Sequence, residues 1–186
     1  MKLFLLVVFS YFLGAIPFSY LIARAKGVAL HQSGTKNIGA SNVILTTGAK
    51  EGAFAMFLDG LKGLVPVILG RYFLVGEWGI VLLVLAAVIG HDFSVYLKFK
   101  GGKGLATSGG AFLAIDPYLT LFCFFFYWAV YLFIKQFILT TLILLTLLPF
   151  FVFVFGLHSS YVFLAAGLAL LSYWTHRKDI RSIIKI

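Results

Sequence analysis

Charged side chains are scarce in this sequence. Asp, Glu, Lys and Arg make up only 11% of its 186 residues, against about 25% in soluble domains. Hydrophobic residues make up 62%, and the mean hydropathy is +1.06. A soluble globular fold is excluded, because its surface needs far more polar side chains than this chain supplies. The composition predicts a polytopic membrane protein.

Acidic residues and cysteine are rarer still. Six Asp and Glu stand against fifteen Lys and Arg, which gives a formal net charge of +9. In a chain with so little aqueous surface, this excess indicates loops that face anionic lipid head groups and an anionic substrate, and not nucleic acid. A single cysteine, Cys123, excludes an intramolecular disulfide. No group of His, Cys and carboxylate residues has the spacing of metal ligands, so we expect neither a metal nor a cofactor.

Seven apolar segments follow one another along the chain. The first is close to the roughly 20 residues that span a bilayer, and no signal-peptide cleavage site follows it. The fourth is too short to cross the bilayer as a straight helix. We expect an all-α integral membrane protein with seven membrane-spanning helices, one of them short, in a single domain over residues 1–186. The predicted spans are residues 3–23, 52–70, 79–96, 105–115, 118–134, 137–155 and 161–174.

Lysine and arginine are distributed unequally between the two sides of this arrangement. Twelve fall on one side and two, Lys2 and Arg71, on the other, with Lys62 inside a span. Cytoplasmic loops carry the excess of basic residues. We therefore place the N-terminus outside and the C-terminus in the cytoplasm, which agrees with an odd number of spans.

A basic glycine-rich segment, FKGGKG at residues 99–104, interrupts the apolar sequence. Glycine lets the backbone approach a ligand closely, successive N–H groups can hold an anion, and Lys100 and Lys103 supply positive charge. A nucleotide P-loop is excluded, because Leu97 stands where that motif has its first glycine and Gly104 where it needs Ser or Thr. The segment indicates a phosphate site, and the alternative is a plain positive-inside loop.

A second polar connector lies between residues 25 and 50, on the same predicted membrane face. Its small residues, amides and hydroxyls suit hydrogen bonding, although a turn-rich linker has a similar composition.

Asp59 and Lys62 share a face of the second span, where they either neutralise each other or contact substrate. His91 and His176 follow the third and last spans and indicate acid–base or phosphate-binding work.

Three motifs resemble the bacterial integral-membrane glycerol-3-phosphate acyltransferases that use acyl phosphate as donor. GTKNIGASN at residues 34–42 is similar to that family's G-S-G-N-x-G-A-T-N. GHDFSVYLKFKGGKGLAT at 90–107 is similar to its G-H…F-K-G-G-K-G-x-A-T, and FLDGLKG at 57–63 recurs in its second helix. The resemblance implies a divergent member with seven helices in the bacterial cytoplasmic (inner) membrane, its active site facing the cytoplasm.

The resemblance also implies a reaction. The 1-hydroxyl of glycerol 3-phosphate would attack the acyl carbonyl of acyl phosphate, giving lysophosphatidate and phosphate in phospholipid biosynthesis. Its partners would be these two substrates and membrane lipids, and we expect a monomer. The implied catalytic residues are Lys103, His91 and His176. Those implied to bind substrate or phosphate are Thr35, Lys36, Asn37, Gly39, Asn42, Lys100, Gly101, Gly102, Gly104 and Thr107.

Several positions depart from the family pattern. Leu45 stands where the family has Arg, which removes a bidentate phosphate ligand. Leu139 replaces a Ser, Asp179 an Asn and Ser94 a Pro, whereas Lys36 replaces a Gly and adds a charge. Two alternatives therefore stay open. One is a divergent relative that acylates another polar acceptor, and the other is a non-catalytic membrane protein that binds or transports phosphorylated anions.

Overall fold

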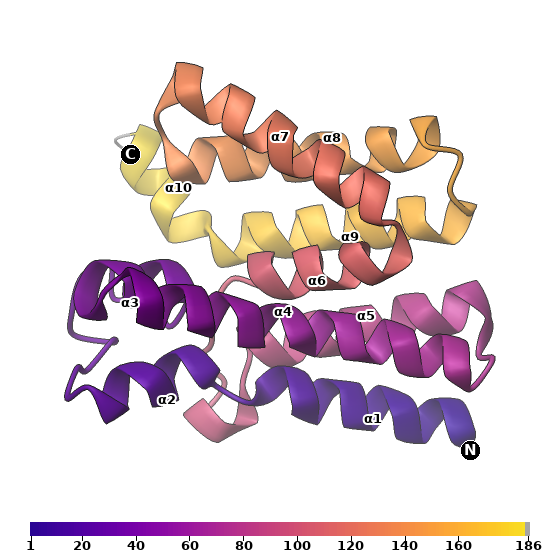
Figure 1. The fold of residues 1–186 in the computed structure, drawn as a ribbon, viewed down its shortest axis with the longest axis horizontal. Helices are drawn as coiled ribbons and strands as arrows, with labels where there is room; N and C mark the ends of the chain where they lie inside the picture. The colour runs from indigo at the N-terminus through magenta and orange to yellow at the C-terminus, as the bar shows by residue number, and fades with distance from the viewer. Residues whose placement is uncertain (185–186) are drawn as a thin grey trace. The chain divides into compact units, whose positions relative to one another are not determined.

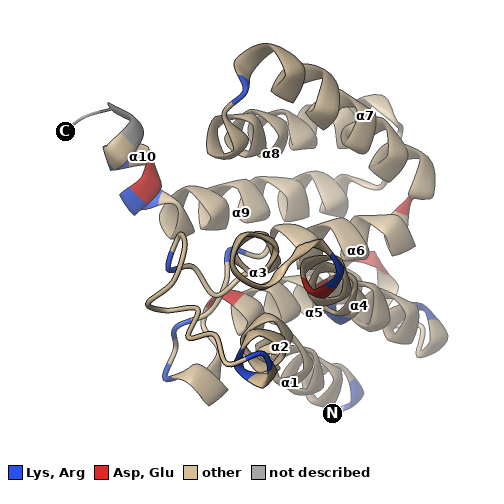
Figure 2. Cartoon of the chain, turned by 60° about the vertical axis from the view of Figure 1, so that its left-hand side comes forward, with Lys and Arg blue, Asp and Glu red and all other residues tan. Residues whose placement is uncertain are grey.

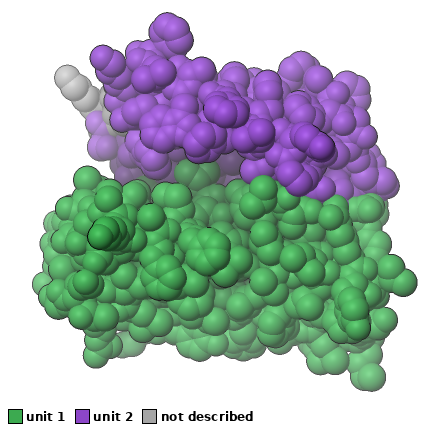
Figure 3. Space-filling model, in the orientation of Figure 1, with its two compact units in different colours: residues 1–114 green, residues 115–186 purple. Residues whose placement is uncertain are grey.

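The regular secondary structure is entirely helical within residues 1–184, the part of the chain that the computed structural model describes (Figure 1). The all-α prediction is therefore confirmed. Lys185, one of the twelve basic residues assigned above to the cytoplasmic side, lies outside the described residues. The chain divides into two compact units, Met1–Ala114 and Ile115–Ile186 (Figure 3). A single domain over residues 1–186 stays a prediction.

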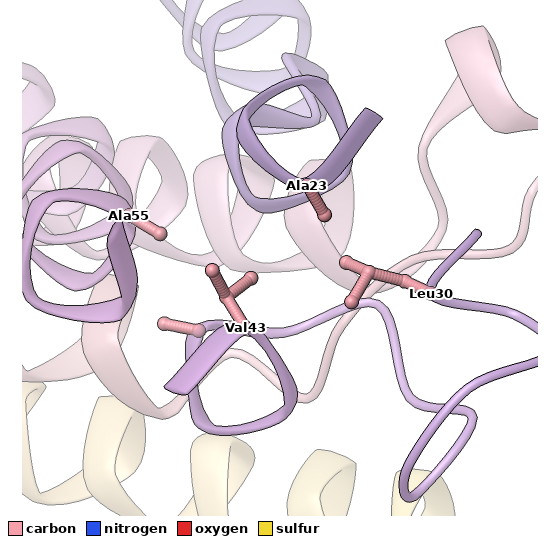
Figure 4. Close-up of a cluster of buried hydrophobic side chains, with 5 residues drawn as sticks. Ala23, Leu30, Val43 and Ala55 are labelled. Carbon is pink, nitrogen blue, oxygen red and sulfur yellow. The ribbon is translucent and has the colours of Figure 1, made fainter. Parts of the chain in front are cut away.

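Unit 1 is a helical bundle with its two polar connectors. In it, α1 and α4 both pack against α5, and α3 packs against α4. Ala23, Leu30, Ala40, Val43 and Ala55 form a buried cluster that anchors the chain between α2 and α4 (Figure 4). The elements are α1 (Lys2–Ala15), α2 (Phe18–Ala25), α3 (Ala40–Thr47), α4 (Ala49–Tyr72), α5 (Gly76–Asp92), the 3-10 turn η1 (Val95–Leu97) and α6 (Leu105–Ile115), whose last residue belongs to unit 2.

The first helix is interrupted at Ile16 and Pro17. Proline has no N–H and disfavours a helical conformation in the residue before it, so α1 ends at Ala15 and α2 begins at Phe18. The Ala15 carbonyl, at the break, accepts a hydrogen bond from Ser94 Oγ at 2.5 Å. The serine that replaces the family's proline thus ties the break to the segment after α5. The first predicted span is two helices and not one.

Unit 2 contains the remaining helices. α8 packs against both α7 and α9. Asp116 caps α7, because its carboxylate accepts a hydrogen bond from Leu119 N at 2.7 Å. Pro117 takes the first helical position, where its missing N–H has no cost. The elements are α7 (Pro117–Ile134), α8 (Phe137–Val154), α9 (Ser159–Thr175) and α10 (Arg177–Ile184).

The protein is a multi-pass membrane protein by the length and apolarity of its helices. Two apolar helices, α6 and α9, are shorter than a standard span. Lys and Arg lie mostly at helix ends and in connecting segments (Figure 2), so the middle parts of the helices are largely uncharged. Each of the seven predicted spans contains helix, and their number as crossings stays a prediction. Among the described residues, five helical segments are long enough to cross a membrane: Lys2–Ala25, Ala49–Tyr72, Gly76–Leu97, Pro117–Ile134 and Phe137–Val154.

Two short helices lie outside the predicted spans. The sequence predicts a turn-rich loop over residues 25–50, but Ala40–Thr47 forms α3 within it. Arg177–Ile184 forms α10 beyond the last predicted span. Each has 8 residues, so neither contains the long apolar run by which membrane spans are located.

Helices α4 and α6 approach closely at Gly63, where a Cβ would collide with the Thr107 carbonyl oxygen. Three residues away, a Cβ on Gly60 would meet Ala106 O at an ordinary 3.7 Å. We expect Gly63→Ala to lower the free energy of unfolding by about 1–3 kcal/mol through overpacking. Gly60→Ala, the matched control on the same helix, should be neutral or stabilising. Unfolding in detergent measures both, and equal effects would contradict the packing.

Candidate functional site

A narrow pocket lies in unit 1 at the break between α1 and α2. Ile38 reaches it from the first polar connector, and Gly101 and Gly102 reach it from the glycine-rich segment. The two connectors that the sequence marks as polar therefore share one pocket. Its lining also includes Ile16, Pro17, Phe18, Ser19, Asp59, Lys62, His91 and Ser94.

A buried ion pair forms one wall of the pocket. Lys62 Nζ lies 2.7 Å from Asp59 Oδ1, and both side chains are almost fully buried. Ser19 Oγ donates to Asp59 Oδ2 at 2.8 Å, and the Phe18 ring centroid lies 5.3 Å from the ammonium. A buried charge is costly unless it is paired and hydrogen-bonded. These contacts therefore stabilise both charges at membrane depth.

His91 connects this ion pair to the glycine-rich segment. Its ring Nδ1 lies 3.2 Å from Lys62 Nζ, and its carbonyl accepts a hydrogen bond from Gly102 N at 3.1 Å. A Cβ on Gly102 would collide with His91 Nε2, and a Cβ on Gly101 would collide with the His91 carbonyl. Two consecutive glycines are needed here because the loop lies directly on the histidine.

The backbone has positive φ angles on both sides of this contact. Lys98 and Phe99 have φ values of 54° and 60°, and Gly104 has a φ of 70°. A side chain on Gly104 would be strained and would crowd the Asp92 carboxylate. Between these positions Lys103 is half-buried.

Two further buried polar residues support the segment. Thr107 Oγ1 donates to Asp59 O at 3.0 Å and is fully buried, so its hydroxyl binds the backbone of α4. This contact positions the start of α6 against α4, and the phosphate contact predicted for Thr107 stays a prediction. Asp92 is 4% exposed, and neither of its carboxylate oxygens has a hydrogen-bond partner within residues 1–184. Sequence reasoning missed Asp92 and Ser19, because a lone Asp or Ser carries no spacing signal.

The first connector is organised around Asn42, which is fully buried. Its Oδ1 accepts a hydrogen bond from Thr35 N at 2.9 Å. Its Nδ2 donates to the carbonyls of Leu30, Ser33 and Asn37 at 3.2, 3.0 and 2.9 Å. Both N–H groups of the side-chain amide are thus engaged within the connector, and its carbonyl accepts one further bond there. These bonds give Asn42 a positioning role, and the substrate contact predicted for it stays a prediction.

The other predicted residues of this connector lie nearer its surface. Thr35 and Lys36 are exposed and Asn37 is half-buried, whereas Gly39 is buried directly before α3. Leu45 is 68% exposed on α3, an apolar side chain where the family pattern has arginine. In the glycine-rich segment Lys100 is exposed as well.

His176 belongs to unit 2 and follows the last residue of α9. Its side chain is buried, and its ring Nδ1 lies 2.9 Å from Ser172 O and 3.1 Å from Ser172 Oγ. A carbonyl oxygen can only accept, so in the neutral ring Nδ1 carries the proton and Nε2 the lone pair. The ring therefore donates at Nδ1 to the backbone of α9. The two remaining departures from the family pattern, Leu139 and Asp179, lie on α8 and α10.

Comparison with known proteins relates the whole chain to one family. Residues 4–186 match the family model described as glycerol-3-phosphate acyltransferase. The glycerol-3-phosphate acyltransferase of Aquifex aeolicus is 37% identical over 186 residues, which cover 99% of this chain and 96% of that protein. The enzyme of the same name from Thermosipho melanesiensis is 40% identical over 179 residues, which cover 94% of this chain and 86% of that protein.

Two solved structures share the fold. They are crystal structures of PlsY, an integral membrane glycerol 3-phosphate acyltransferase, in its glycerol 3-phosphate and lysophosphatidic acid forms. Their TM-scores are 0.93 and 0.92 at 35% and 34% identity, and each match covers 100% of this chain and 93% of the other. The resemblance seen in the sequence motifs is thereby confirmed along the full length. The chain belongs to the glycerol-3-phosphate acyltransferase family.

Proposed function

We propose that this protein transfers a fatty acyl group from acyl phosphate to the 1-hydroxyl of glycerol 3-phosphate, giving lysophosphatidic acid and phosphate. Full-length similarity to acyltransferases of that name, one of them solved in glycerol 3-phosphate and lysophosphatidic acid forms, is the observation that carries the proposal. The shared pocket supports it, because Gly101 and Gly102 line the pocket and the next residue in the chain is the half-buried Lys103.

The chemistry places modest demands on the protein, because acyl phosphate is already activated. The acceptor's hydroxyl oxygen forms a bond to the acyl carbonyl carbon, and the bond from that carbon to the phosphate oxygen breaks. The hydroxyl proton passes to a phosphate oxygen or to a histidine. The protein has to hold two phosphates and align the hydroxyl, and to stabilise the charge that develops on the carbonyl oxygen.

We assign roles in the reaction to the residues of the two polar connectors from their positions. We assign phosphate binding to Lys103 and Lys100 with the N–H groups of Gly101, Gly102 and Gly104, since charge and backbone donors occur together there. We assign the opposite wall to the first connector. The residues of that wall are Thr35, Lys36, Asn37 and Gly39. The proposal that His176 accepts a proton comes from the sequence motifs alone.

The proposed topology has seven spans, with the N-terminus outside, the C-terminus in the cytoplasm and the pocket open to the cytoplasm of the bacterial inner membrane. The distribution of Lys and Arg supports this orientation. We propose a monomer as the working unit, because the pocket described above is lined by residues of a single unit of one chain.

Purified protein in detergent, given acyl phosphate and glycerol 3-phosphate, should release phosphate and form lysophosphatidic acid in equal amounts. Release should stop when the acceptor is omitted. Lys103→Ala should lower kcat/KM by about hundredfold or more, because a charged contact to the reacting phosphate is lost. Lys50→Ala, which changes an exposed lysine in the first turn of α4, should leave kcat/KM unchanged.

Other results would redirect the assignment. Phosphate release without an acceptor would identify a hydrolase. Faster transfer to another polyol or polar alcohol would identify a different acceptor. The reason to test this is the exposed Leu45, which stands where the family pattern has arginine. If acyl phosphate is never consumed, the enzymatic proposal fails, and substrate flux in proteoliposomes becomes the next measurement.

A further inference from the structure

The contacts of His91 determine which of its ring nitrogens carries the proton. Lys62 Nζ lies 2.7 Å from the Asp59 carboxylate, so it is an ammonium, which has three donors and no acceptor. His91 Nδ1, 3.2 Å from that ammonium, can therefore only accept. A neutral imidazole that accepts at Nδ1 carries its proton on Nε2.

We propose that His91 is a fixed hydrogen-bond donor of the active site, with Nε2–H directed at the glycine-rich segment, and that Lys62 is the positioning residue that selects this tautomer. The inference rests on the proposed function and deepens it, because it gives His91 a stated role in the reaction. The two buried histidines carry their protons on different nitrogens, Nε2 in His91 and Nδ1 in His176.

The surroundings of Nε2 suit a donor to substrate. Nε2 lies against Gly102, at the point where a Cβ would collide with it, and both residues line the pocket. Within residues 1–184 the ring makes hydrogen bonds through Nδ1 and none through Nε2. A fixed N–H group in a site closed to water stabilises a substrate oxygen that gains negative charge. The acyl carbonyl oxygen and the departing phosphate both have this property.

The same geometry opposes a role for His91 as general base. Its free lone pair is on Nδ1 and is directed at the Lys62 ammonium. Protonation there would remove this hydrogen bond and place two buried positive charges beside the single Asp59 carboxylate, whose Oδ1 lies 3.7 Å from Nδ1 and beyond hydrogen-bond distance. The acid–base role predicted for His91 is therefore reassigned to that of a donor.

Nitrogen-15 NMR of histidine-labelled protein measures the tautomer without reference to turnover. The chain has four histidines; His31→Gln, His158→Gln and His176→Gln assign three of them, and His91 follows by elimination. We expect His91 to show a protonated Nε2 and an unprotonated Nδ1, and His176 to show the reverse in the same sample. A protonated Nδ1 on His91 would overturn the proposal. An inactive protein with the expected tautomer would instead refute only the proposed acyltransferase function.

Two substitutions at His91 test whether the donor contributes to the reaction. His91→Gln keeps an N–H donor near the position of Nε2 without a titratable ring, whereas His91→Leu removes the donor. We expect His91→Leu to lose about 10²–10³-fold in kcat, as for other removed oxyanion donors. His91→Gln should stay within about tenfold of wild type, because the donor is retained. Equal losses in the two variants would favour a base and overturn the donor role.

The part played by Lys62 is tested separately. Asp59→Asn combined with Lys62→Met removes both charges, so no unpaired charge stays buried. In this double variant we expect the His91 signals to show a mixture of tautomers, whereas Lys62→Arg, which keeps the cationic donor, should retain protonated Nε2. An unchanged tautomer in the double variant, or a changed one in Lys62→Arg, would show that Lys62 does not set it.

Discussion

Gly102→Ala should lower kcat/KM by about hundredfold, because a misplacement of about 1 Å in a site costs a factor of that size. The added methyl group would occupy the space of His91 Nε2. Neither partner can move away easily, since Gly102 N is bound to the His91 carbonyl at 3.1 Å and the ring is held by Lys62. Steady-state kinetics with acyl phosphate and glycerol 3-phosphate measure the loss.

The control for this variant is Gly109→Ala in α6. No atom lies within 4 Å of a Cβ placed on Gly109, and alanine is the better residue in a helix interior by about 1 kcal/mol. We expect Gly109→Ala to be fully active and Gly102→Ala to keep the helical circular dichroism of wild type. Full activity of Gly102→Ala would mean that the glycine-rich segment does not need its contact with His91.

Asn42→Ala should unfold the first connector and so lower both the free energy of unfolding and the transferase activity. The substitution leaves the carbonyls of Leu30, Ser33 and Asn37 without their common donor and Thr35 N without its acceptor. Each buried group left unsatisfied costs about 1–3 kcal/mol. Thermal or denaturant unfolding in detergent measures the loss of stability. The KM for glycerol 3-phosphate should rise, because one wall of the pocket is no longer fixed.

A matched control lies five residues further along the same helix. Thr47 Oγ1 donates only to the Val43 carbonyl, within α3, so Thr47→Val should change stability by no more than about 0.5 kcal/mol. Asn42→Asp keeps the acceptor for Thr35 N but places a buried carboxylate oxygen against three carbonyl oxygens, so it should be at least as destabilising as Asn42→Ala. An Asn42→Ala variant as stable as Thr47→Val would show that the connector is held by other contacts.

The helices of the fold were predictable because membrane-spanning segments appear in the sequence as long runs of apolar residues. The fourth predicted span, residues 105–115, coincides with α6, since Gly104 and Pro117 mark its ends in the sequence. The break at Pro17 was not predictable in the same way. Pro66 and Pro149 lie inside unbroken helices α4 and α8, so a proline in an apolar run does not by itself reveal a break. At Pro17 the freed Ala15 carbonyl has a partner in Ser94, a tertiary contact that the sequence does not reveal.

The location of the site was predictable from the sequence, but the roles of its individual residues were not. The motifs around Ile38 and Gly102 are polar and glycine-rich, and the structure brings both to one pocket. An asparagine such as Asn42 suits a ligand contact and a loop contact equally well, and only its burial separates the two. The bond from Ser19 to Asp59 joins residues 40 positions apart, a distance over which no local pattern operates.

The break in the first helix also sets how deep the pocket lies. α1 has 14 residues, so at 1.5 Å per residue the break lies about 20 Å along its axis. The hydrocarbon layer is about 30 Å thick. For the proposed reaction, a donor dissolved among lipid tails can then bring its carbonyl to the pocket without being extracted from the bilayer. Glycerol 3-phosphate would enter the pocket from water. A lipid-soluble donor and a water-soluble acceptor could then react without either one leaving its own phase completely.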